Sequence, residues 1–193
     1  DVRPPQPEHA PFSRSDVLRA RAEARSLARS SQYELAADVL AAAAQQATRV
    51  LGTADPDLLS LRFELANLLF DGGEYARGAQ EFGALAADLA RHDGPDDSVA
   101  LQCRRQEATC NAMLGRVDEA LAQLRALLVD ESRWLGPDHG WVFELRKQIG
   151  LLELGGHRPE QARNTLEALL RDLDRVGNQN AAAAEVRTLI EGL

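Results

Sequence analysis

The sequence predicts an all-α fold in which four helical hairpins form an α–α superhelix that ends in a capping helix. Three observations support this prediction. The 193 residues are 45% hydrophobic but only 5% aromatic, with Ala and Leu dominating the apolar set, which is typical of helices packed on helices. Small residues recur at an interval of 42 residues. Glycines fall between these repeats and within them, where helices are expected to end.

Three rows of equivalent positions define the repeat. The first row is small and contains Ala36, Gly78, Ala120 and Ala162. A second small row, twelve residues earlier, contains Ala24, Ala66, Ala108 and Gly150. A bulky row, four residues after the first, contains Leu40, Phe82, Leu124 and Leu166. Small residues let two helix backbones approach closely, and a large side chain one turn later fills the space beside them, so we expect all three rows to lie inside the hairpins.

The chain begins with a proline-rich stretch, and the repeats follow it. Four of the eight prolines lie within the first eleven residues, so we expect residues 1–14 to be a disordered linker to another part of a longer protein. The repeat domain is expected to span residues 15–193. Its units are expected at residues 17–58, 59–100, 101–142 and 143–184, with the capping helix at residues 185–193.

Helix boundaries are expected where capping residues and glycines occur. Asp55 followed by Pro56 has the form of an N-cap and a first-turn proline. Further N-cap candidates are Asp97, Asp118, Asp138 and Asn180. Helices inside the units are expected to end near Gly72, Gly115 and Gly155, and the units themselves near Gly52, Gly94, Gly136 and Gly177. Each unit is therefore expected to be a helical hairpin.

Two segments carry a resemblance to a known family. Residues 73–75 (Gly-Glu-Tyr) followed by Gly78 and Phe82, and residues 115–120 followed by Leu124, resemble the turn and second helix of tetratricopeptide repeats (TPRs). The usual repeat has 34 residues, and the longer period of this chain is similar to that of kinesin light chains and their bacterial relatives. Ser31 replaces the turn glycine in the first unit, and residues 155–158 read as a one-residue insertion in the fourth.

The resemblance implies a concave groove lined by the first helix of each hairpin. The positions that would face a bound peptide are Arg21, Arg25, Phe63, Asn67, Arg105, Gln106, Lys147 and Gln148. In kinesin light chains, asparagines at such positions bind the backbone of an extended peptide, and the resemblance implies a comparable role for the amide side chains in this set. Its basic members favour an acidic partner. The alternative is that they pair with neighbouring carboxylates, as most surface charges do.

Some of the larger apolar side chains are expected in the core. Others are expected at the surface, where they would form an apolar floor that anchors a side chain of a partner. Phe63, Phe70, Met113, Leu151 and Leu154 are candidates for that floor. Within this set we expect Phe70 and Leu154 to belong to the core and Phe63 to be the anchor for a partner side chain. Trp134 is expected to pack within the long linker between the third and fourth units, and Trp141 is left without a role.

The sequence offers no candidate catalytic residue, metal site or cofactor motif. Cys103 and Cys110 are too few for a disulfide framework, and without histidine or cysteine at ligand spacing they are expected to be buried, reduced thiols. The net charge of −8 disfavours nucleic acid as a partner. No run of apolar residues is long enough to insert into a membrane, and we expect a cytoplasmic protein.

These observations favour a protein–protein interaction scaffold that binds a peptide or protein segment, and not an enzyme. Lys147 is the only lysine among 22 basic residues, a preference typical of GC-rich bacterial genomes, and the resemblance favours a regulatory region of a larger bacterial signalling protein such as a Ser/Thr kinase. One alternative is a homo-oligomer that associates through Val186, Leu189 and Ile190 of the terminal helix. The other is a helical repeat that binds RNA or a small ligand.

Overall fold

The computed structural model describes residues 12–177 and 180–193, and every regular element within them is an α-helix. The predicted all-α class is therefore confirmed. The proline-rich stretch at residues 1–11 lies outside the described residues. The first helix begins at Arg14, which is the last residue of the expected linker. The remaining domain limits stay a prediction.

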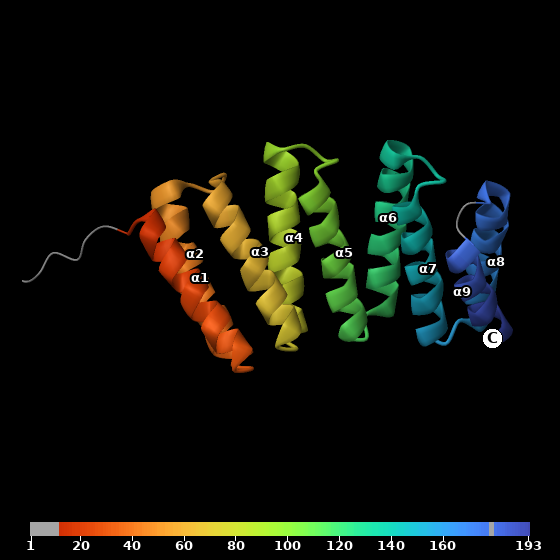
Figure 1. The fold of residues 1–193 in the computed structure, drawn as a ribbon, viewed down its shortest axis with the longest axis horizontal. Helices are drawn as coiled ribbons and strands as arrows, with labels where there is room; N and C mark the ends of the chain where they lie inside the picture. Colours follow the sequence, from red (N-terminus) through yellow and green to blue (C-terminus); the bar gives the residue numbers. More distant parts are fainter. Residues whose placement is uncertain (1–11, 178–179) are drawn as a thin grey trace, which may run out of the picture. The chain divides into compact units, whose positions relative to one another are not determined.

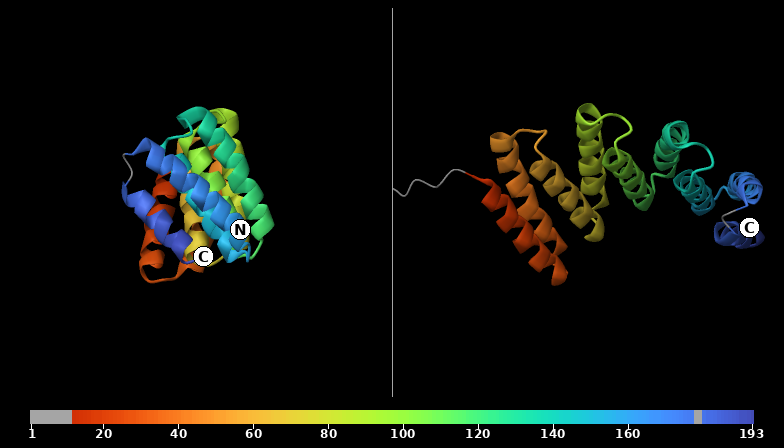
Figure 2. Two further views of the ribbon diagram at one scale, coloured as in Figure 1. Left: turned by 90° about the vertical axis from the view of Figure 1, so that its right-hand side faces the viewer. Right: turned by 45° about the horizontal axis from the view of Figure 1, so that its top comes forward.

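The described chain divides into two compact units. The first ends at Glu74 and contains α1 (Arg14–Arg29), α2 (Tyr33–Leu51) and α3 (Pro56–Asp71). The second runs from Tyr75 to Leu193 and contains α4 (Tyr75–His92), α5 (Ser98–Met113), α6 (Val117–Leu135), α7 (Gly140–Gly155), α8 (Pro159–Val176) and α9 (Asn180–Glu191). Within each unit, helices that follow one another in the chain pack against one another (Figure 1). In the second unit, α5, α6 and α7 lie side by side in Figure 1 and in the right-hand view of Figure 2.

The three repeat rows are all buried, as the sequence predicts. Every non-glycine member is at most 2% exposed, and the glycine members are buried too. The closest approach lies between α7 and α8. A Cβ atom added to Gly150 would lie 2.8 Å from Cδ2 of Leu166, closer than carbon atoms normally pack. Glycine at this position is therefore required by the bulky residue that faces it.

Helix starts recur with the same period as the rows. The residues that precede α1, α3, α5 and α7 are Ser13, Asp55, Asp97 and His139. Asp55 Oδ1 accepts hydrogen bonds from the backbone N–H groups of Asp57 (2.9 Å) and Leu58 (3.4 Å), and Asp97 Oδ1 accepts one from Ala100 (2.8 Å). These two predicted N-caps are confirmed, because each side chain satisfies backbone donors that a helix start leaves free.

Three further cap assignments were wrong. Asp118 is the second residue of α6, whose N-cap is Arg116. Asp138 lies one residue early, because His139 Nδ1 accepts the hydrogen bond from Trp141 N at 3.2 Å. Asn180 is the first residue of α9 and not the residue before it. A carboxylate near a helix start is favoured anywhere in the first turn, so charge alone does not identify the cap.

The turns inside the hairpins show that the repeat has no insertion. The backbone adopts positive φ at Ser31 (57°), Gly73 (78°), Gly115 (76°) and His157 (59°). These positions are separated by 42 residues throughout, so the insertion expected at residues 155–158 was wrong. His157, and not Gly155 or Gly156, takes the left-handed position that favours glycine. The four turns thus share one geometry although two of them lack glycine there.

The terminal helix α9 completes the core of the second unit. Ala183 and Val186 are buried against Phe143 and against Leu166, Leu169 and Leu173 of α8, and Leu189 and Ile190 pack at the edge of the same cluster. Val186 is only 1% exposed. The helix therefore uses within its own unit the apolar residues that the self-association alternative assigned to a second copy. It begins at Asn180, five residues before the expected cap.

Candidate functional site

A groove of about 560 Å³ opens on the second unit between α5, the end of α6 and the start of α7. Its lining combines aromatic, amide and charged side chains with few aliphatic ones. The lining residues are Ser98, Leu101, Gln102, Arg105, Gln106, Glu131, Trp134, Leu135, His139 and Trp141. The volume falls in the range of ligand-binding clefts, and the mixture of apolar and polar groups is the one that such clefts use. We call this feature the tryptophan groove.

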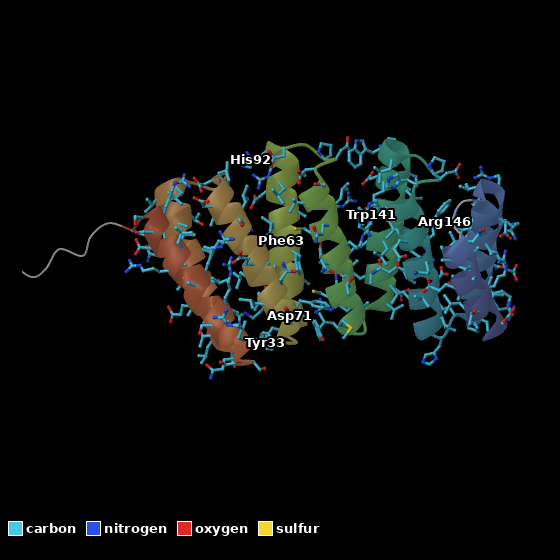
Figure 3. All side chains as sticks on the ribbon, in the orientation of Figure 1. Tyr33, Phe63, Asp71, His92, Trp141 and Arg146 are labelled. Carbon is cyan, nitrogen blue, oxygen red and sulfur yellow. The ribbon has the colours of Figure 1, made fainter. Side chains whose placement is uncertain are left out.

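Both tryptophans of the chain lie in this groove. Trp134 belongs to the last turn of α6 and is 51% exposed, and Trp141 belongs to the first turn of α7 and is 59% exposed. The expectation that Trp134 packs within the linker was therefore wrong. Figure 3 labels Trp141, which lies beside α5 and α6. Large exposed indole rings next to a cleft are typical anchors for a protein partner.

The α6–α7 loop holds Trp141 in place through local hydrogen bonds. Gly136 has a φ of 92°, and its N–H donates to the carbonyl of Ser132 at 3.1 Å, which ends α6. The N–H of His139 then donates to the carbonyl of Gly136 at 3.2 Å. The His139 side chain caps α7 at Trp141 N. The backbone that carries Trp141 is thus fixed from both sides, which lowers the entropy cost of using it to bind.

Arg105 contacts both the ring of Trp141 and the carboxylate of Glu131. The centre of its guanidinium lies 5.2 Å from the centroid of the Trp141 ring, a cation–π distance. Its Nη2 also donates to Glu131 Oε1 at 2.7 Å. The Glu131 side chain is 3% exposed and that of Arg105 is 19% exposed, so this ion pair is largely removed from water.

The Arg105–Glu131 pair leaves part of its hydrogen-bonding capacity unused. Arg105 Nε and Glu131 Oε2 are enclosed and have no hydrogen-bond partner among the residues that the structure describes. Buried polar atoms nearly always have a partner, and leaving one without a partner costs free energy. The ion pair beneath the groove therefore keeps one enclosed donor and one enclosed acceptor without a partner, which reduces its contribution to stability.

Of the groove residues expected from the sequence, Arg105 and Gln106 line the tryptophan groove. Lys147 instead borders a small cavity of about 40 Å³ near α9 and pairs with Glu144 (2.9 Å) and Glu185 (3.0 Å). Desolvation lowers the pKa of Lys147, but the hydrogen bonds to the two glutamates outweigh it and raise the pKa overall. Gln148 Nε2 lies 3.4 Å from Thr109 Oγ1.

The remaining expected residues lie in the first unit and contact one another. Arg21 and Arg25 of α1 both pair with Glu64 of α3, Arg21 through Nε at 3.0 Å and Arg25 through Nη2 at 3.3 Å. Burial raises the pKa of Glu64, but the two arginines lower it more and leave it below its usual value. Asn67 Nδ2 donates to the carbonyl of Phe63 at 2.9 Å. These three basic and amide side chains therefore have partners inside the unit.

The pairing of basic side chains in both units matches the alternative raised from the sequence. Arg21, Arg25, Arg105 and Lys147 each have a carboxylate partner. Much of their positive charge is thus compensated locally, although Arg21 and Arg25 share Glu64, and an acidic partner gains less from them than an unpaired stripe would offer.

The two cysteines are buried thiols, as expected. Both are 0% exposed, and burial raises the pKa of Cys110 to about 11. Within residues 12–177 and 180–193, no three His, Cys, Asp or Glu side chains are placed to hold a metal ion together. Over the same residues, no helix is both long enough and apolar enough to cross a membrane.

The sequence analysis missed Gln102, Glu131 and both tryptophans as site residues. One signal could have found the tryptophans. The repeat places His92 and Val99 one period before Trp134 and Trp141, so the two indoles interrupt the pattern at a single junction. Large aromatic residues gathered at one junction of an otherwise regular repeat favour a specific contact there. Glu131 gave no such signal, because a lone glutamate in an amphipathic helix is ordinarily exposed.

Neither a family model nor a curated protein matches the sequence. Solved structures do match the fold. A candidate kinesin light chain of Podosopora anserina with nearly identical TPR-like repeats is 15% identical, with a TM-score of 0.73 over 92% of this chain and 85% of that chain. A point variant of that protein is 16% identical, with a TM-score of 0.67 over 94% of this chain and 96% of that chain.

A third similar structure is BtubC (BKLC) from P. vanneervenii. It is 17% identical, with a TM-score of 0.64 over 91% of this chain and 79% of that chain. At this level of identity the likeness concerns the fold. The chain has the TPR-like helical-repeat fold of kinesin light chain repeats, and the resemblance stated from residues 73–82 and 115–124 is confirmed at that level.

Proposed function

We propose that this chain is a protein–protein interaction scaffold without chemistry of its own, and that the tryptophan groove of the second unit binds a segment of a partner protein. The observation that carries the proposal is the exposure of Trp134 and Trp141 beside a groove of about 560 Å³. Indole rings exposed at a cleft lose more water-accessible apolar area on binding than any other side chain does, so they dominate the energy of many protein interfaces.

The polar side chains of the groove support a peptide as its occupant. Gln102 and Gln106 are one turn apart on α5 and line the groove with Arg105. Amide groups donate and accept hydrogen bonds, which suits the alternating carbonyl and N–H groups of an extended backbone. Two of the similar structures are of a kinesin light chain protein with TPR-like repeats, and this supports the same class of function for this chain.

The wider setting is also part of the proposal. We place the scaffold in a larger bacterial signalling protein, such as a Ser/Thr kinase, with residues 1–14 as a linker before the repeat domain. Its two buried cysteines, which form no disulfide framework, suit a reducing compartment such as the cytoplasm. The expected groove residues of the first unit, Arg21, Arg25, Phe63 and Asn67, are proposed as a separate binding surface of that unit.

A peptide-display selection on the full chain tests the binding role. Peptides enriched on the wild-type protein are then measured against Trp141→Ala and Trp134→Ala. Each substitution is expected to weaken binding by about 30-fold, the scale of an interface anchor. Val129→Ala is the matched control, because Val129 is 57% exposed on α6 but does not line the groove. Peptides that bind all four proteins equally would contradict the assignment of the groove.

A salt titration separates this mechanism from binding driven by charge. Because the basic groove residue Arg105 is paired with Glu131, raising the ionic strength from low to high is expected to change the affinity of selected peptides by less than about 3-fold. Selection of strongly acidic peptides whose affinity falls steeply with salt would instead favour the acidic partner expected from the sequence.

A further inference from the structure

We propose that His139 makes binding in the tryptophan groove dependent on pH, because only its neutral imidazole can cap the helix start that carries Trp141. This inference rests on the proposed binding function and names a regulation of that groove. His139 and Trp141 both line the groove and lie two residues apart, across the start of α7. A partner segment is expected to bind more weakly in mild acid than at neutral pH.

The cap of α7 differs in chemistry from the equivalent caps of the repeat. The residues that precede α1, α3, α5 and α7 are Ser13, Asp55, Asp97 and His139. Serine and aspartate side chains accept hydrogen bonds throughout the range from pH 5 to pH 8, whereas histidine ordinarily changes its charge within that range. Of these four positions, the one beside the groove is therefore the one whose cap responds to pH near neutrality.

The capping hydrogen bond requires an unprotonated nitrogen. His139 Nδ1 accepts from the backbone N–H of Trp141 at 3.2 Å, so it must carry a lone pair. A protonated imidazole has hydrogen on both nitrogens and accepts at neither. Its positive charge would also lie at the positive end of the α7 dipole, which disfavours it there. Acid therefore breaks the cap and leaves the Trp141 N–H, a donor that the helix itself does not satisfy, without this acceptor.

The charged groups around His139 do little to hold the protonated form in the capping position. The carboxylates of its loop, of the end of α6 and of the first turns of α7, and that of α8 beside the loop, each have a basic partner already. These pairs are Asp138–Arg175, Glu131–Arg105, Glu144–Lys147 and Asp172–Arg146. The last turn of α6 adds a further positive charge, Arg133. His139 itself forms no ion pair with any residue that the structure describes.

Loss of the cap acts on the groove through Trp141. The His139 carbonyl still accepts from the N–H groups of Val142 (3.0 Å) and Phe143 (3.1 Å), so α7 stays helical beyond its first turn. The first turn itself becomes less ordered, and its indole must be ordered again when a partner binds, which costs conformational entropy. On the scale of a lost N-cap, we expect binding at pH 5.5 to be about 5-fold weaker than at pH 7.5.

Nuclear magnetic resonance of the full chain tests the cap without any ligand. The backbone amide signal of Trp141 is followed from pH 7.5 to pH 5.5 together with the imidazole signals of His139, and both are expected to change with one midpoint. In His139→Asp, which carries the cap found at Asp55 and Asp97, the Trp141 signal is expected to stay in place. The control His92→Gln removes a histidine that does not line the groove and should behave as wild type.

A binding measurement then connects the cap to the groove. Its probe is a histidine-free peptide selected on the wild-type chain at pH 7.5, and its Kd is measured at pH 7.5 and at pH 5.5. The Kd is expected to rise about 5-fold in wild type and in His92→Gln. In His139→Asp it should change by less than about 2-fold, whatever the affinity of that variant at pH 7.5. A 5-fold rise that persists in His139→Asp would overturn the inference.

The two measurements separate failure of the regulation from failure of the function. If peptides bind in a manner that depends on Trp141 but the Trp141 amide signal does not follow His139, the binding function stands and the regulation is overturned. If the signal follows His139 but no selected peptide depends on Trp141, the proposed function fails and the regulation fails with it. Agreement of both measurements with the expected changes supports the regulation.

Discussion

Replacement of Gly150 by alanine tests the packing between α7 and α8 with a single added carbon. The new Cβ would lie 2.8 Å from Cδ2 and 2.9 Å from Cγ of Leu166, whereas carbon atoms pack at about 3.5 to 4.0 Å. Leu166 is 0% exposed and is surrounded by Phe143, Leu169 and Leu173, so it cannot rotate into solvent. The clash must therefore be relieved by moving buried groups.

Two opposing effects set the size of the change. Alanine in a helix interior is better than glycine by about 1 kcal/mol, while overpacking a closed core costs about 1 to 3 kcal/mol. Gly155→Ala is the matched control on the same helix, since nothing lies within 4 Å of its added Cβ. It should gain up to about 1 kcal/mol. We therefore expect Gly150→Ala to be less stable than Gly155→Ala by about 1 to 3 kcal/mol.

Thermal unfolding followed by far-ultraviolet circular dichroism measures this difference. For a chain of this size, 1 kcal/mol shifts the Tm by about 2 to 4 °C. Adding Leu166→Ala to Gly150→Ala should cost less than the sum of the two single changes by more than about 0.5 kcal/mol, because the smaller side chain makes room for the methyl group. A Gly150→Ala protein that melts at or above the temperature of Gly155→Ala would refute the close packing.

Three further predictions concern backbone strain, charge burial and thiol reactivity. His157→Gly should raise the free energy of unfolding by about 1 kcal/mol in chemical denaturation, because His157 occupies a left-handed conformation at φ 59°; a loss of stability would mean that its side chain contributes more than the backbone strain costs. Desolvation raises the pKa of Glu107, so ionising it opposes folding above pH 4.5 and not below. Glu107→Gln should therefore be more stable than wild type at pH 7 and lose that advantage near pH 4, and it retains an oxygen for the 2.9 Å hydrogen bond from Gln123. Cys110, with a pKa of about 11, should resist iodoacetamide at pH 7.5 as judged by mass spectrometry, and rapid labelling of the folded chain would contradict its burial.

The repeat itself could be predicted from the sequence because close packing of helices requires small residues at regularly spaced positions. Where two backbones must come close, only small residues fit, so Ala108 and Gly150 recur at the positions that steric exclusion dictates. The caps Asp55 and Asp97 were predictable for a similar reason. A short carboxylate side chain just before a helix accepts hydrogen bonds from the first backbone N–H groups of that helix. Such positions are determined by local geometry and by the nearest helix.

The candidate site was harder to predict because the type of a residue does not show whether its side chain is exposed. Trp134 and Trp141 were judged by their apolar character, and Trp134 was accordingly assigned to packing. The equivalent residues Val50 and Val99 are themselves 54% and 37% exposed, so these are surface positions of the repeat. An apolar residue is often exposed in a folded protein, and only its neighbours decide what it does. Those neighbours, Arg105 and Glu131, lie 26 residues apart in the sequence.

Nuclear magnetic resonance of the two indole N–H groups tests the binding groove most directly. The full chain labelled with nitrogen-15 should give one indole signal from Trp134 and one from Trp141, the only tryptophans present. Titration with a peptide selected on the wild-type chain should shift both signals together and to saturation, along with the backbone amides of Gln102 and Gln106. Saturable binding that moves other amides and leaves both indole signals in place would contradict the account.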